Sequence, residues 1–183
     1  MSDQTLIDHG APTLAGIKTG SLFSVRIEER SVFLNELKNY NKRLRAKGVC
    51  LIPLHYDNRR VLLYLYRPNR LKNDLCNKEV QNMLREKGYA CESMGKCICE
   101  LKKRLNDTEN FPHEIGLFLS YPPEDVKGFI ENSARNCKSV GTWKVYGDKE
   151  NAEKTFARYK RCTETFKECS SRGISLDRLL VAI

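Results

Sequence analysis

Long apolar runs are missing from this sequence. No uninterrupted apolar stretch approaches the roughly 18 residues that a membrane-spanning helix requires. The first 16 residues, MSDQTLIDHGAPTLAG, have no basic region followed by a continuous apolar region, so they do not resemble a secretory signal. Hydrophobic residues make up 40% and charged residues 30% of the chain, which argues against wholesale disorder. We therefore expect a soluble cytoplasmic protein with no membrane partner.

Common metal and nucleotide motifs are also missing. The eight cysteines include no CxxC pair, and the one local cluster, Cys91, Cys97 and Cys99, does not match zinc or iron–sulfur spacings. We predict reduced thiols and no metal site, with Cys97 and Cys99 on different faces of a helix. No phosphate-binding GxxxxGK[ST] loop, dinucleotide fingerprint or catalytic triad is present. The reaction type and any cofactor therefore stay open.

The charge balance is basic, but no run of five or six consecutive basic residues occurs. The chain has 32 Lys and Arg against 23 Asp and Glu, a formal charge of +9. This excess favours an anionic partner: a phosphorylated or otherwise anionic small molecule, an acidic protein or a nucleic acid. The basic residues are spread over predicted helices at 38–48, 100–105 and 157–161, where each group is typical of a solvated helix face. Nucleic acid is the least favoured of the three partners.

The hydrophobic pattern predicts a single α+β domain over residues 1–183, with a central sheet of about four strands covered by helices. A hairpin over 49–67 supplies two of these strands, and its second strand, apolar on both faces, is expected to be central. Residues 1–24 either cover a pocket or add an edge strand. The other predicted strands lie near 115–120 and 142–146, and the predicted helices cover 31–48, 70–88, 94–106, 122–132, 148–173 and 176–183.

The stretch FPHEIGLFLSYPPEDVKGFIEN, residues 111–132, is the most unusual part of the chain. His113 and Glu114 precede the predicted strand and Tyr121 follows it. A strand of about six residues, rising about 3.3 Å each, would separate the two ends by roughly 20 Å. Only one end, or neither, is then expected to be functional. His113 next to Glu114 is typical of a general base, although neighbours on a strand point to opposite faces, and a structural His113 is favoured.

Tyr121 stands where the predicted strand ends and a helix begins. Such a junction exposes backbone N–H groups that attract anions. Glu124 and Asp125, however, occupy the first turn of that helix, where their charges complement the helix dipole and repel a phosphate. Capping by these two acids is the favoured interpretation.

GIKTGSLF, residues 16–23, is the most ligand-like loop. Lys18 and Thr19 stand between two glycines and offer a cation, a hydroxyl and accessible backbone amides. Arg67, at the end of the central strand, is the natural second cation for a carboxylate or phosphate. The alternatives are a plain turn with an exposed Lys18 and an Arg67 paired with an acid at the edge of the core.

In GTWKVYGD, residues 141–148, successive side chains are expected to point to opposite faces of a strand. We expect Trp143 and Val145 to face the core, with Lys144 and Tyr146 opposite them, lining a pocket or meeting solvent. Cys137, between a helix and a strand and beside a lysine, is a candidate thiolate nucleophile. The alternative is an inert thiol, which is what half or more of such cysteines are.

Four segments, residues 9–24, 61–71, 111–132 and 137–148, together with the spacing of Phe156, Tyr159 and Cys162, resemble the bacterial domain-of-unknown-function family numbered 3793 over nearly the whole chain. The resemblance implies an origin in anaerobic Firmicutes and relatives and no established activity. It also implies a role in redox or metal physiology and a flavodoxin-type partner, because genes of the family neighbour flavodoxin and ferrous-iron transport genes. Many similar sequences carry a Cys directly after the residue that corresponds to His9, where this chain has Gly10. Any function of that Cys would be lost here.

Three hypotheses of function follow, in order of preference. The first is a protein or enzyme of anaerobic metabolism that binds an anionic or redox-active small molecule. The second is a thiol or metal handler, and the third is a binder of nucleic acid or an acidic protein. The candidate catalytic residues are His9, His113, Glu114 and Cys137, and the candidate ligand-binding residues are Lys18, Thr19, Arg67, Tyr121 and Lys144.

Overall fold

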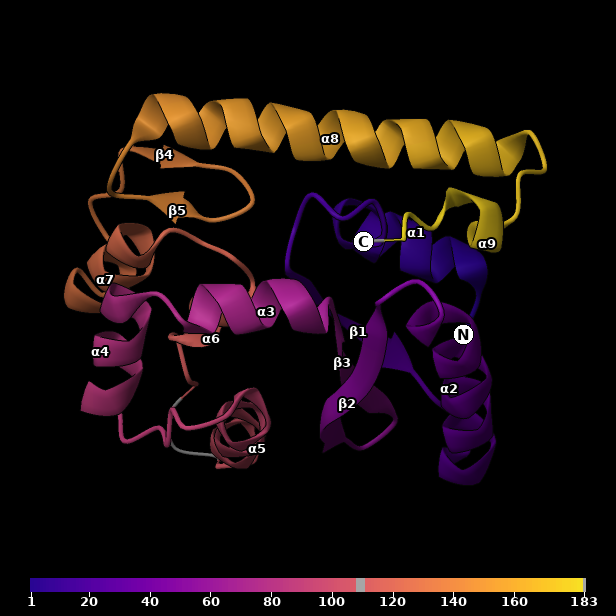
Figure 1. The fold of residues 1–183 in the computed structure, drawn as a ribbon, viewed down its shortest axis with the longest axis horizontal. Helices are drawn as coiled ribbons and strands as arrows, with labels where there is room; N and C mark the ends of the chain where they lie inside the picture. The colour runs from indigo at the N-terminus through magenta and orange to yellow at the C-terminus, as the bar shows by residue number, and fades with distance from the viewer. Residues whose placement is uncertain (108–110, 183) are drawn as a thin grey trace. The chain divides into compact units, whose positions relative to one another are not determined.

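A computed structural model describes residues 1–107 and 111–182 (Figure 1). The chain divides into two compact units, which are described separately. Unit 1 comprises Met1–Asn69 and Tyr159–Ile183, and unit 2 comprises Arg70–Arg158. Helices dominate and the strands are antiparallel, which confirms the α+β class. The single-domain organisation stays a prediction.

Unit 1 is built on a three-stranded antiparallel sheet in the order β1-β3-β2. The predicted hairpin is confirmed as β2 (Cys50–Asp57) and β3 (Arg60–Tyr66), joined at Asn58, whose φ of 46° is tolerated well by asparagine. The third strand is β1 (Gly20–Arg26), so the N-terminal segment does supply an edge strand. The sheet has three strands, not the four predicted.

The central position of β3 follows from its sequence. Val61, Leu63 and Leu65 join the core of unit 1, and each is fully buried. On the opposite face Tyr64 stacks on Tyr66 with 4.7 Å between ring centroids. A strand that is apolar on both faces is stable only where both faces are covered, and the middle of a sheet meets that requirement.

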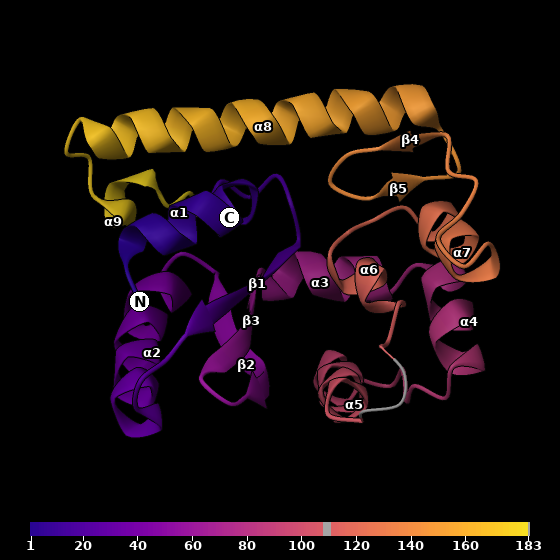
Figure 2. The ribbon, with the colours of Figure 1, turned by 180° about the vertical axis from the view of Figure 1, so that it is seen from behind.

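Four helical segments complete unit 1: α1 (Asp3–Leu14), α2 (Arg30–Arg45), the second half of α8 (Lys149–Ser171) and α9 (Leu176–Leu179). Figure 2 shows α9 beside α1, which it contacts. The helix predicted over 31–48 is confirmed as α2, which begins one residue earlier than predicted, after Glu29. Gly48 does follow the end of α2, with a left-handed φ of 71°.

Arg67 holds the helix ends of unit 1 together. Its side chain is 2% exposed, and the guanidinium donates to the carbonyl oxygens of Thr13 (2.6 Å) and Leu14 (2.5 Å) at the end of α1. It also donates to Lys47 O (3.2 Å) after α2 and Val181 O (2.8 Å) after α9. A cation at these sites donates to carbonyls at or just after helix C-termini and complements the negative ends of the helix dipoles.

Unit 2 is mostly helical. The predicted helix over 70–88 is instead two helices, because Asn77 interrupts it and caps the second with its side chain. The predicted helices over 94–106 and 122–132 are confirmed. The helices are α3 (Pro68–Leu75, which begins at the unit boundary), α4 (Lys78–Glu86), α5 (Met94–Leu105), α6 (Ile115–Phe118) and α7 (Pro123–Glu131), followed by the start of α8.

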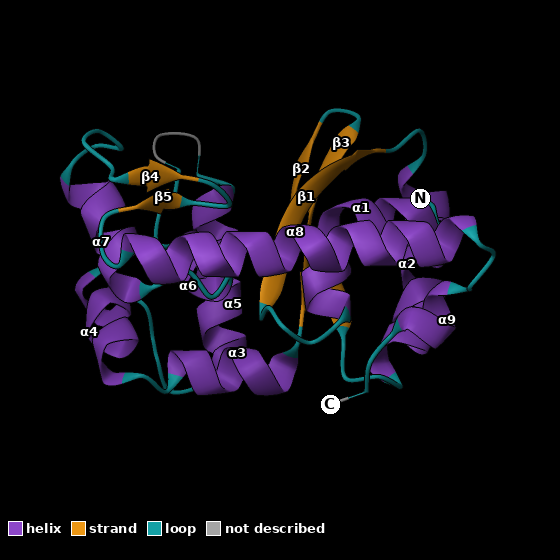
Figure 3. Ribbon diagram, turned by 90° about the horizontal axis from the view of Figure 1, so that it is seen from above, coloured by secondary structure: helices purple, strands orange, loops and turns teal. Residues whose placement is uncertain are grey.

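Two of the four predicted strands are corrected. Residues 115–118 form the short helix α6, not a strand, because a brief apolar run fits a buried helical turn as well as a strand and only packing decides. The strand over 142–146 shrinks to β5 (Lys144–Val145), which pairs with β4 (Ser139–Val140) in a separate two-stranded hairpin (Figure 3). This hairpin packs on α7 through β5.

We predict that Arg67→Met lowers the free energy of unfolding by about 3–5 kcal/mol, because up to four carbonyl oxygens lose a charged donor inside the protein. Urea unfolding followed by circular dichroism measures the change. Arg60→Met, at an exposed position of the same strand, is the control and should change the stability by less than about 1 kcal/mol. Equal losses in the two variants would contradict the role assigned to Arg67.

Candidate functional site

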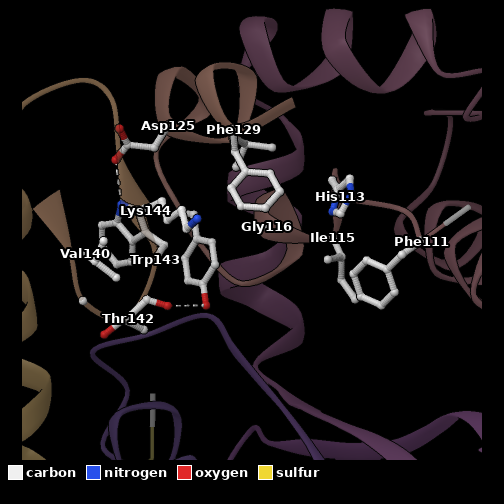
Figure 4. Close-up of a pocket in the computed structure, with 13 residues that line it drawn as sticks. Phe111, His113, Ile115, Gly116, Asp125, Phe129, Val140, Thr142, Trp143 and Lys144 are labelled. Atoms are coloured by element: carbon white, nitrogen blue, oxygen red, sulfur yellow. Dashed lines mark hydrogen bonds between the residues drawn. The ribbon is translucent and has the colours of Figure 1, made fainter. Parts of the chain in front are cut away.

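A cavity of about 350 Å³ lies in unit 2, between the segment around α6, helix α7 and the β4–β5 hairpin (Figure 4). Aromatic and aliphatic side chains form most of its wall. Phe111 and Val140 are largely exposed at this site, whereas Trp143, the only tryptophan of the chain, is 9% exposed. The lining residues are Phe111, His113, Ile115, Gly116, Tyr121, Asp125, Val126, Phe129, Val140, Gly141, Thr142, Trp143 and Lys144.

The two ends of the 111–132 stretch converge on this cavity. The expectation that His113 and Tyr121 are too far apart to share a site is wrong, because both line it. The residues between them form α6, which rises about 1.5 Å per residue where a strand would rise about 3.3 Å. The chain then turns back, and Tyr121 N donates to Gly116 O at 3.0 Å. The helix therefore turns a linear sequence feature into a compact site.

Gly116 permits the close packing of α6 on α7. A Cβ at this position would lie 2.8 Å from Val126 Cγ2 and 3.1 Å from Tyr121 Cδ2. The first separation is shorter than carbon atoms tolerate, so a larger residue would push α6 away from α7. The close approach of α6 to α7 beside the cavity thus depends on the missing side chain.

Asp125 fastens the hairpin to α7. Its carboxylate is buried (2% exposed) and accepts hydrogen bonds from Trp143 Nε1 at 2.6 Å and from the backbone N–H groups of Tyr146 and Gly147 at 2.7 Å. The predicted place of Asp125 in the first turn of the helix is confirmed. Its hydrogen bonds to the hairpin were not predicted. The one indication in the sequence was Trp143, since a buried indole N–H requires a hydrogen-bond acceptor.

Lys144 and His113 face the cavity with unused polar capacity. Lys144 Nζ donates to Ala134 O at 2.7 Å and lies 6.0 Å from the centroid of the Phe129 ring. An ammonium has three N–H donors, so two have no hydrogen-bond partner among the described residues. The His113 imidazole packs against Phe111 and Phe129, at centroid distances of 5.6 and 5.0 Å, and its ring nitrogens likewise have no partner in the described part of the chain.

Glu114 turns away from its neighbour His113 into the interior of unit 2. It is 5% exposed and accepts a hydrogen bond from Tyr89 Oη at 2.9 Å, with Arg104 Nη1 3.8 Å away. Burial, and then the charge of Glu114, raise the pKa of Tyr89. These contacts join the segment before α6 to α5. Glu114 does not line the cavity, and neither does Cys137, which is half-buried in the same unit.

The GIKTGSLF loop packs into unit 1. Lys18 is only 7% exposed, its amine lies 5.8 Å from the centroid of the Tyr159 ring, and burial lowers its pKa to about 8. Thr19 is fully buried, and its carbonyl accepts a hydrogen bond from Arg67 N at 2.9 Å. The alternative of a plain turn with an exposed Lys18 is therefore wrong. Ligand binding by Lys18, Thr19 and Arg67 stays a prediction.

The His9 region belongs to unit 1 as well. The imidazole is exposed and stacks on Phe23 with 5.1 Å between centroids. At the next position, a Cβ on Gly10 would lie 2.4 Å from Leu65 Cδ2. A cysteine at this position would thus point into the core of unit 1 and would require the Leu65 side chain to move.

The cysteine cluster follows the expected helix geometry. Cys97 is buried in α5 whereas Cys99 is exposed, and burial raises the pKa of Cys97 to about 11. A thiol with so high a pKa is protonated at neutral pH and is a poor nucleophile. Within residues 1–107 and 111–182, no three His, Cys, Asp or Glu side chains are grouped so that they could hold a metal ion. In the same ranges, no helix combines the length and the apolar character that crossing a membrane requires.

We predict that Asp125→Ala destabilises the hairpin by about 2–4 kcal/mol, because three N–H donors lose their acceptor and one of them is a buried indole. Urea unfolding followed by Trp143 fluorescence measures the loss directly. Glu124→Ala is a matched control, since Glu124 is exposed in the same helical turn and shares only the helix-dipole effect. A similar loss in both variants would assign the effect to the helix terminus.

We predict that Lys18→Met stabilises the protein at pH 7 by roughly 1–3 kcal/mol. The folded-state pKa of about 8 lies below the ordinary 10.5, so protonated Lys18 disfavours folding and the full penalty is present below pH 8. Between pH 8 and 10.5 the unfolded chain binds the extra proton, wild-type stability rises, and the advantage of the variant disappears. Thermal unfolding across this pH range checks the trend, with exposed Lys38→Met as control. An advantage that is constant with pH would contradict the assignment.

Comparison with known proteins places the chain in one family. No curated protein and no solved structure matches it. Residues 6–180 match the family described as protein of unknown function (DUF3793), which covers nearly the whole chain and confirms the resemblance seen in the sequence. The chain therefore belongs to the DUF3793 family.

Proposed function

We propose that this protein binds a small organic anion in the unit 2 cavity. The observation that carries the proposal is that Lys144 and His113 keep polar atoms without a hydrogen-bond partner among the described residues, on an otherwise largely apolar wall. Ligand sites typically combine an apolar lining with a few polar groups that fix the orientation of the ligand. Both residues come from the set predicted from the sequence, and Tyr121 of that set lines the same cavity.

The charges of the cavity favour an anion. Lys144 supplies a positive charge and two available donors, whereas the carboxylate of Asp125 already binds three N–H groups. A cationic ligand would meet Lys144 and would have to compete with those three donors for Asp125. An anionic ligand would instead form charged hydrogen bonds, which are stronger than neutral ones.

The size of the cavity favours a small metabolite. At about 350 Å³ it lies near the lower end of the 300–1,000 Å³ that is typical of ligand pockets. Such a volume suits a molecule of one or two rings and is too small for a dinucleotide. The exposed Phe111 and Val140 provide an apolar entrance.

The proposal predicts that a panel of small organic carboxylates and phosphate esters contains at least one compound that raises the melting temperature and changes Trp143 fluorescence. Ligand at a hundredfold excess over its Kd stabilises the native state by about 2.7 kcal/mol. Trp143 is the only tryptophan and lines the cavity, so its emission reports on this site.

Substitution of Lys144 separates specific from nonspecific binding. Lys144→Met should raise the Kd of a carboxylate ligand at least about tenfold, because a charged hydrogen bond is lost. Lys127→Met removes the same charge from an exposed position on α7 outside the cavity wall and should leave the Kd unchanged. Compounds that stabilise the Lys144→Met and Lys127→Met variants equally bind outside the cavity. If no compound of the panel loses affinity in Lys144→Met alone, the proposal is overturned.

A further inference from the structure

The two available polar groups of the cavity lie on different sides of one aromatic ring. Figure 4 shows the Phe129 ring between the Lys144 amine and the His113 imidazole. The amine is 6.0 Å and the imidazole centroid 5.0 Å from the centroid of that ring. A ligand that reaches both groups must therefore extend across Phe129.

The body of such a ligand meets aromatic rings. The ring centroids of Tyr121 and Trp143 lie 4.9 Å apart. Together with the rings of Phe129, Phe111 and His113, they make five rings in the cavity wall. Aromatic rings interact with one another by offset stacking or edge-to-face contact, and each such pair contributes beyond its buried area. A flat ring can form these contacts, whereas a puckered saturated ring of the same size forms only ordinary apolar contacts.

The polar groups at the two ends differ in chemistry. Lys144 offers only N–H donors and a positive charge, which suits a carboxylate. A neutral imidazole offers one donor and one acceptor, so it can bind a hydroxyl or an amine.

Resting on the proposed function, we infer that the ligand is a planar aromatic acid with its carboxylate at Lys144 and a hydrogen-bonding group at the opposite end of the ring, near His113. The ring would pack against Phe129. The inference concerns recognition and requires no chemical step.

The test uses para-hydroxybenzoate as the probe, with its saturated-ring analogue and unsubstituted benzoate as matched compounds. The indole N–H of Trp143 gives a single signal in a proton–nitrogen correlation spectrum of the full chain, so titration of that signal yields each Kd at this site. We expect para-hydroxybenzoate to bind about three- to tenfold more tightly than the saturated analogue. Benzoate, which lacks the group that would reach His113, should bind with an intermediate Kd.

Variants assign the two ends of the probe. Lys144→Met should raise the Kd of para-hydroxybenzoate at least about tenfold. Lys144→Arg, which keeps the charge, should retain most of the wild-type affinity. His113→Leu should remove the difference between para-hydroxybenzoate and benzoate and leave benzoate nearly unchanged. An unaltered Trp143 unfolding transition shows that each variant is folded.

The outcomes distinguish the two proposals. Saturated and aromatic acids that bind equally well, with loss of both in Lys144→Met, would overturn the planar-ring inference and keep the anion site. Equal binding of para-hydroxybenzoate and benzoate by the wild type would overturn the role of His113. If the larger panel of anions finds cavity ligands but no aromatic acid shifts the Trp143 signal, the inference fails alone. If no anion binds at the cavity, the proposed function fails with it.

Discussion

The carboxylate of Asp125 is the constraint on which the candidate site depends. The β4–β5 hairpin has only two residues in each strand, too few to be stable without support. Asp125 supplies that support, because one buried side chain on α7 accepts hydrogen bonds from the indole of Trp143 and from two backbone N–H groups after β5. The same bonds orient Trp143 and place Lys144 beside the Phe129 ring. A structural carboxylate thus positions the residues that we assign to ligand binding, without being free to bind a cation itself.

Unit 1 relies on a charged group of the opposite sign in the same way. Arg67 joins the ends of α1, α2 and the C-terminal segment through carbonyl oxygens, and Lys18 is also buried in the same unit. The sequence shows the charge of both cations but not their burial, and ligand binding by them stays a prediction. In unit 2 the comparable cation, Lys144, has two N–H donors without a hydrogen-bond partner in residues 1–107 and 111–182. The Arg67 guanidinium donates to four backbone carbonyl oxygens and the Lys144 ammonium to one, and this difference is a property of packing.

Regular periodicity made much of the fold predictable. The hairpin of β2 and β3, the central place of β3, and helices α2, α5, α7 and α8 all follow from apolar spacing together with Gly48, Pro123 and Asp148 at helix ends. The predictions failed where the signal was short. The apolar run over 115–118 suits a strand as well as a helix, and this single error made His113 and Tyr121 seem to be about 20 Å apart. The role of Asp125 was missed because its partners follow it by 18 to 22 positions.

By itself the sequence determined the α+β class, the family, and the residue types from which a site can be built. These depend on composition, on local periodicity and on ordered motifs, all of which are properties of neighbouring residues. Only the tertiary structure decided which of the nine candidate residues meet. It brought His113, Tyr121 and Lys144 to one cavity, turned Glu114 towards Tyr89, and enclosed Lys18 and Arg67 in unit 1. The physical reason is that burial and hydrogen-bond partners arise between segments distant in the chain, and close packing selects among them.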